Sequence, residues 1–133
     1  MKSFEPVYRE IENLFIKKLP DYIEKINKEH NDGILLQPFE NMSLEENCIK
    51  TPCFKFGIEE AEYTEKDRAI ENTIYSVSFE ILLNNNTKTP VILLWRYVEA
   101  VNKMLEELEE NNLWQKIKIT DFVKNKIKIQ ITV

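Results

Sequence analysis

His30 is the residue best suited to acid–base chemistry, and it is the only histidine among the 133 residues. It stands close to Glu29 and Asp32, so one interpretation is a general acid or base assisted by a carboxylate. The other interpretation is a surface histidine that is favoured by the negative end of a helix dipole. No second histidine and no nucleophile stand near His30 in the sequence, which favours the surface histidine.

Carboxylates occur in two runs, Glu45-Glu46 and Glu59-Glu60-Glu62. Paired carboxylates can serve glycoside hydrolysis, and a site built from carboxylates alone would suit calcium. The D-x-[DN]-x-[DN]-G loop of calcium sites is missing, however, and acidic runs are usually solvated surface. We therefore predict no catalytic residue, no metal site and no enzymatic activity.

Cysteine and glycine usage removes further classes of site. Cys48 and Cys53 are the only cysteines and lack the second ligand pair of a zinc site. We expect buried or incidental thiols, because disulfides are rare in the cytosol. Gly33 and Gly57 are the only two glycines, where average usage of about 7% would give roughly nine. Dinucleotide fingerprints, P-loops and kinase-type loops need closely spaced glycines, so no cofactor is predicted.

The charge pattern bears on partners. A net charge of −5 and a pI near 5.1 argue against specific nucleic-acid binding, which usually shows a basic excess. Residues 116–133 carry five lysines against one acid, and the preceding stretch is acidic. This segregation indicates either docking to a partner or a solvated face. The N-terminus has no apolar signal region and no stretch is long enough to span a membrane, so we expect cytoplasmic synthesis and no membrane partner.

Apolar residues at helical spacing predict three helices. The first covers residues 4–18, and a second, shorter one at residues 21–29 ends at Asn31-Asp32-Gly33. The third starts at Thr89-Pro90 and should end at Asn111-Asn112. Trp95 is expected to widen its buried stripe. Residues 34–52 are expected to form a long connecting loop.

Period-two alternation predicts two antiparallel hairpins, one on each side of the third helix. Phe54, Phe56 and Tyr75 share apolar faces with Val77 and Ile81, which favours core packing over a stacking platform for single-stranded nucleic acid. The order α-α-β-β-α-β-β predicts a single α+β domain, residues 1–133, with helices on one face of a mainly antiparallel sheet of four or slightly more strands. The strands are expected at residues 53–58, 75–83, 114–119 and 127–133.

A resemblance to a known family rests on the stretches LPDYIEKINKEHNDGI, CFKFGIEEAEY, ENTIYSVSFEILL, TPVILLWRYVEAVNKMLEEL and KIKIQITV. Their succession of N-terminal helix, hairpin, long helix and closing hairpin resembles the tail-terminator and tail-completion (minor tail) proteins of tailed bacteriophages. The likeness covers most of the chain. It is a likeness of architecture, since no diagnostic motif of the family is present.

The resemblance implies a non-enzymatic structural protein of a phage or prophage, located in the virion tail. It implies a homo-oligomeric ring, typically a hexamer, at the end of the tail tube, with the tube and the head-completion proteins as partners. The alternative is a small intracellular protein-binding module or complex subunit of a low-GC bacterium. Candidate interface residues lie in a charged connection and on a lysine-bearing edge: Glu62, Glu65, Lys66, Asp67 and Arg68, and Lys124, Lys126 and Lys128.

Overall fold

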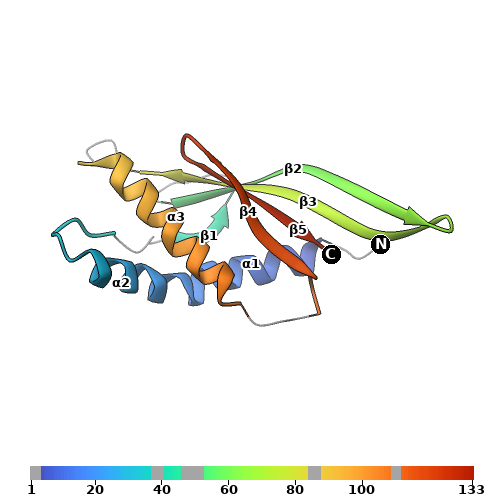
Figure 1. Ribbon diagram of the computed structural model, residues 1–133, viewed down its shortest axis with the longest axis horizontal. Coiled ribbons are helices and arrows are strands. Elements are labelled where there is room, and N and C mark those ends of the chain that lie inside the picture. Colours follow the sequence, from blue (N-terminus) through green and yellow to red (C-terminus); the bar gives the residue numbers. More distant parts are fainter. Residues whose placement is uncertain (1–3, 37–40, 46–52, 84–87, 109–111) are drawn as a thin grey trace.

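The computed structural model describes residues 4–36, 41–45, 53–83, 88–108 and 112–133. The expected α+β class, with two helices, a hairpin, a third helix and a second hairpin, is confirmed (Figure 1). Among the described residues, no helix is both long and apolar enough to cross a membrane. In chain order the elements are α1 (Glu5–Lys17), α2 (Leu19–His30), β1 (Asn41–Glu45), β2 (Cys53–Lys66), β3 (Ala69–Leu82), α3 (Pro90–Glu106), β4 (Lys116–Val123) and β5 (Lys126–Thr132).

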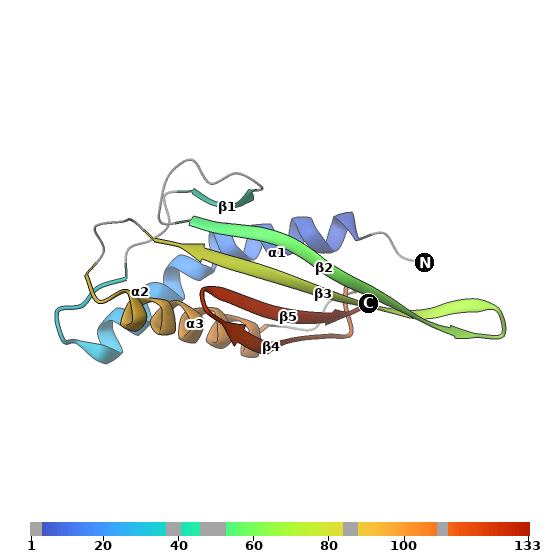
Figure 2. The ribbon, with the colours of Figure 1, turned by 90° about the horizontal axis from the view of Figure 1, so that it is seen from above.

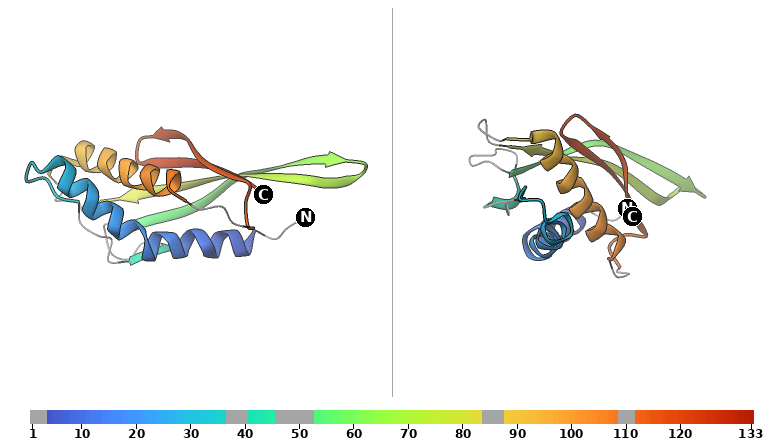
Figure 3. Two further views of the ribbon diagram at one scale, coloured as in Figure 1. Left: turned by 60° about the horizontal axis from the view of Figure 1, so that its bottom comes forward. Right: turned by 60° about the vertical axis from the view of Figure 1, so that its left-hand side comes forward.

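Helices α1 and α2 follow each other with only Lys18 between them, and they run almost end to end (Figure 3). Each has a proline in its first turn, where the missing backbone N–H costs no hydrogen bond. Helix α2 ends at Asn31, which adopts the left-handed conformation with φ 42° and donates its N–H to Asn27 O. Gly33, with φ 83°, then turns the chain away from the helix, as its position in the sequence predicted.

The sheet has five strands in the order β1-β2-β3-β5-β4, and the helices cover one of its faces (Figures 1 and 2). The four strands β2, β3, β5 and β4 are antiparallel, whereas β1 pairs with β2 in parallel. The prediction of a loop throughout residues 34–52 is therefore wrong for residues 41–45. Strand β1 finds its backbone partners on β2, and a local, mostly polar sequence carries no signal for such a long-range pairing.

The core lies between the helices and the inner face of the sheet. The ring of Phe15 from α1 packs between Phe54 of β2 and Phe79 of β3, with ring centroids 5.0 and 4.7 Å apart. On β5 the alternation of half-buried and buried residues confirms the predicted amphipathic strand. Phe54 and Tyr75 are buried and Phe56 is partly buried against the same cluster, so the expected core role of these aromatics is confirmed.

The first hairpin is much longer than predicted. Instead of a charged connection at residues 62–72, β2 and β3 remain paired as far as Lys66 and Ala69. The turn is only Asp67-Arg68, with φ 54° and 66°, the two positive values of a type I′ turn. The prediction failed because this stretch has no apolar alternation. A two-stranded ribbon that projects beyond the other strands is solvated on both faces and needs none (Figure 1).

Helix α3 differs from expectation in its end and in one face. It ends at Glu106 instead of at Asn111-Asn112, and residues 109–111 lie outside the described residues. Val101 and Met104 are buried, but Trp95, which was expected on the same buried stripe, is 55% exposed. The side of the helix that carries Trp95 therefore faces away from the core.

Cys53 is buried and disulfide-bonded, so the expectation of a free thiol is wrong for this residue. Cys48 lies outside the described residues. Disulfide formation depends on which sulfur atoms the fold brings within bonding distance, and spacing in the sequence does not reveal this.

Candidate interaction surfaces

The first predicted group of interface residues lies at the free end of the β2–β3 hairpin, which we call the ribbon (residues 62–74; Figure 1). Glu62 of β2, Ile74 of β3 and Thr132 of β5 lie side by side in the sheet. Past this point the hairpin continues without a pairing strand from β5. The carboxylates and guanidinium of this group are exposed wherever their side chains are described. Glu62, Glu65 and Lys66 belong to the end of β2, and Asp67 and Arg68 form the turn.

The second predicted group lies on the face of the sheet that the helices leave open. Lys126 and Lys128 alternate along β5 with the buried Ile127 and Ile129. Their strand is not an edge, which corrects the sequence-based expectation, because β5 lies between β3 and β4. The order of strands in a sheet depends on how the chain folds back on itself, and the alternation within one strand does not reveal it.

Three of the predicted lysines share one hollow on this open face. It has a volume of about 310 Å³ and is lined by Glu59, Val123, Lys124, Asn125, Lys126 and Lys128. Asn125 secures the turn between β4 and β5, since its carbonyl accepts the N–H of Ile81 at 2.8 Å and its side chain donates to Ile81 O at 3.1 Å. The hollow therefore belongs to the rigid part of the sheet and carries a local excess of positive charge.

The two predicted groups approach each other only where the ribbon begins, since Glu62 pairs with Ile74 and Lys128 with Ser78, four residues further along β3. Their two turns lie far apart. The β4–β5 turn lies beside Ile81, whereas the ribbon ends at Asp67-Arg68, twelve or more residues away along β3. At about 3.3 Å per residue this is a separation of roughly 40 Å. Figures 1 and 2 show the ribbon and the β4–β5 turn pointing to opposite ends of the molecule. A contact between the ribbon turn and the β4–β5 turn must therefore involve two molecules.

Sequence reasoning missed a third surface, at the edge strand β4. The exposed ring of Trp95 on α3 contacts Phe122 of β4, with centroids 5.1 Å apart. Val91 and Ile92, one turn earlier, are 66% and 40% exposed, and Val123 is 44% exposed. The available signal was the run VILLW at the start of α3, since a helix that is apolar all round needs partners on more than one side.

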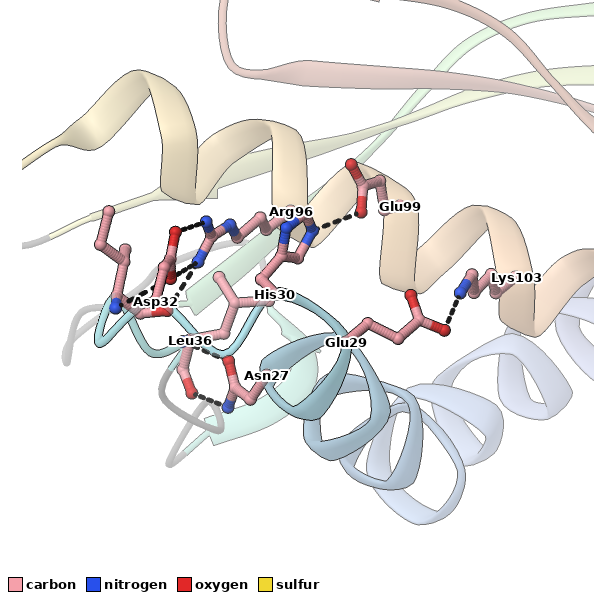
Figure 4. A network of polar contacts seen from close by, with 9 residues as sticks. Asn27, Glu29, His30, Asp32, Leu36, Arg96, Glu99 and Lys103 are labelled. Atoms are coloured by element: carbon pink, nitrogen blue, oxygen red, sulfur yellow. Dashed lines mark hydrogen bonds and ion pairs between the residues drawn. The ribbon is translucent and has the colours of Figure 1, made fainter.

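Glu29, His30 and Asp32, the group considered for acid–base chemistry, all contact helix α3 (Figure 4). His30 Nε2 lies 3.1 Å from Glu99 Oε2, and Lys103 Nζ lies 2.5 Å from Glu29 Oε1. The hydrogen bond from Lys103 lowers the pKa of Glu29. These contacts form a row along the joint between α2 and α3, an arrangement that positions helices.

The Arg96–Asp32 pair is the most enclosed part of this row. The Arg96 side chain is 6% exposed and donates to both carboxylate oxygens of Asp32 and, at 2.7 Å, to Ile34 O. Asp32 also accepts the N–H of Ile34 at 3.1 Å. The hydrogen bond from Arg96, and then that from Ile34, lowers the pKa of Asp32 to about 2. Asp32 thus joins the end of α2 to α3 as a carboxylate.

Within the described ranges, no group of three or more histidine, cysteine, aspartate or glutamate residues is placed to hold a metal ion.

Comparison with protein-family models, with curated proteins and with solved structures finds no match for this chain.

Proposed function

We propose that this chain is a non-enzymatic assembly subunit of a phage or prophage tail, acting as a tail terminator or tail-completion protein. Its partners are further copies of itself in a ring, a hexamer by the family resemblance, together with the tail tube and head-completion proteins. One reason for the proposal is that the order of helices and strands resembles that of the family. The other reason is the geometry of the sheet.

The observation that carries the proposal is the exposed edge of the sheet at β4. An edge strand presents backbone N–H and C=O groups that can pair with a strand of another molecule. Beside this edge, Trp95, Phe122 and Val123 offer apolar surface. Backbone pairing would fix the orientation of the partner strand, and burial of the aromatic and aliphatic side chains would supply the free energy of association.

Ring formation requires a heterologous contact, in which one surface of a subunit meets a different surface of the next. The ribbon and the β4 edge fit this requirement because the ribbon projects past one end of the sheet, whereas β4 forms one of its sides (Figure 2). The runner-up function is a small intracellular protein-binding module or complex subunit, which would use the same edge for a different chain.

Multi-angle light scattering across a range of protein concentrations, followed by electron microscopy, tests the proposal. We expect a discrete oligomer with a ring shape, and neighbouring genes that encode a portal, capsid, tail tube or tape-measure protein. The variant Trp95→Lys should weaken the oligomer, whereas the matched change Ile16→Lys, at an exposed position of α1, should not. A gene neighbourhood consisting of a metabolic operon, or a monomer at every concentration, would overturn the proposal.

A further inference from the structure

We propose that the ribbon of one subunit docks into the lysine-lined hollow of the next, so that the two charged surfaces are the two halves of a single contact. This inference rests on the proposed assembly function and names the surfaces that would join the subunits. The occupant of the hollow is therefore a second copy of this chain.

Charge complementarity is the first argument. The ribbon, residues 62–74, carries four acidic residues against two basic ones. Residues 116–128, which form β4, its turn and the start of β5, carry five lysines against one acid. The whole chain has a net charge of −5, so the charge of this lysine-rich segment is opposite to that of the chain as a whole. Opposite potentials of this kind steer association and fix its register.

Geometry is the second argument. Glu59 lines the hollow, and the ribbon turn at Asp67 comes eight residues later, roughly 26 Å away at about 3.3 Å per residue, so the tip of the ribbon cannot reach the hollow of its own chain. A narrow, two-stranded projection beyond the sheet and a recess on its open face are suited to a head-to-tail contact. Repetition of such a contact closes a ring if the rotation between subunits allows it, or else forms a filament.

The composition of the hollow is the third argument. Lys124, Lys126 and Lys128 share it with the single carboxylate of Glu59, and Glu80 is the cross-strand neighbour of Lys126. The lining itself has three ammonium groups against one carboxylate, and Asp121 of β4 is the cross-strand neighbour of Lys128. On the ribbon, the side chains of Glu62 and Glu65 are exposed. Docking would give these carboxylates partners while the rest of the hollow stays hydrated.

Charge reversal on each side separately tests the contact, and mixing tests its pairing. The ribbon variant is Glu62→Lys with Glu65→Lys, and the hollow variant is Lys126→Glu with Lys128→Glu. Each alone should weaken self-association at least about tenfold, because like charges then meet. An equimolar mixture should restore it, since each reversed surface finds an opposite partner on the other variant. Raised salt should weaken the wild-type oligomer.

Controls separate this contact from folding and from the proposed function. Lys17→Glu with Lys18→Glu makes the same charge change on exposed residues of α1 and its end, and it should leave association unchanged. Charge reversal of Lys126 places a carboxylate opposite Glu80, so it can impair folding, which circular dichroism monitors. In that case the milder Lys126→Gln with Lys128→Gln tests the hollow.

Two outcomes overturn the contact, and they bear differently on the proposed function. An oligomer that survives both charge reversals overturns this contact and leaves the ring intact. A wild type that stays monomeric while its hollow binds duplex DNA, with loss of binding in the glutamate variant, overturns both proposals.

Discussion

Arg96 of α3 and Asp32, just beyond α2, are joined by paired hydrogen bonds although 64 residues separate them in the chain. The fork of the guanidinium matches the two carboxylate oxygens, and a third hydrogen bond to Ile34 O completes the site. The pair therefore couples the end of the N-terminal helical layer to the helix that covers the β5 side of the sheet.

Asp32 makes folding stability sensitive to acid. Its pKa is lowered from 3.8 to about 2 in the folded state, so its stabilisation is present above pH 3.8 and is lost as the pH falls towards 2. The urea midpoint of the wild type should drop across this window. Asp32→Asn should be less stable at neutral pH and show a smaller drop. An unchanged acid profile in Asp32→Asn would contradict the assignment.

Tyr22 makes folding stability sensitive to alkaline pH. Its hydroxyl donates to Glu107, and this hydrogen bond, with burial and the charge of Glu107, raises the pKa of Tyr22 to about 12. Stability that depends on neutral Tyr22 is complete below pH 10 and is lost as the pH rises towards 12. In an alkaline titration followed by near-ultraviolet absorbance, a tyrosine that ionises near pH 12 in the wild type should be missing in Tyr22→Phe. Glu107→Gln should bring that ionisation to lower pH.

The position of Ile129 in the core predicts a graded loss of stability. Ile129 is 1% exposed, whereas Ile58, also on a strand, is 56% exposed. Ile129→Val should cost about 1 kcal/mol of the free energy of unfolding, because a buried methyl group is lost. Ile58→Val should cost less than about 0.5 kcal/mol. Equal losses in urea denaturation would show that the two side chains share the same environment.

The turn of the ribbon is a site for local stabilisation. Asp67 and Arg68 both adopt positive φ, which asparagine and glycine accept more readily. Asp67→Asn combined with Arg68→Gly should stabilise the hairpin end by about 1 kcal/mol, since a side chain in the left-handed region is removed. Amide hydrogen exchange of the ribbon should slow about fivefold. Arg68→Ala retains a Cβ and should bring no such gain; a similar slowing in that variant would refute the strain argument.

Lys126 and Lys128 show which structural features the residue pattern of a single strand can predict. Alternation of isoleucine and lysine correctly predicted that β5 has one buried and one more accessible face. It did not reveal that β4 lies outside β5, so the lysines were assigned to an edge instead of to an open sheet face. The difference moved the candidate contact from a strand edge to a hollow.

The order of amino acids was enough to predict the three helices, the two hairpins and the main apolar faces, because each depends on a local period of apolar residues. The opposite charges of the ribbon and of residues 116–128 can also be counted along the chain. The folded domain was needed to show which strand lies at the edge, that β1 joins β2, and that Asp32 meets Arg96. These relationships join residues far apart in the chain, and their free energy comes from packing and pairing that exist only once the whole domain has folded.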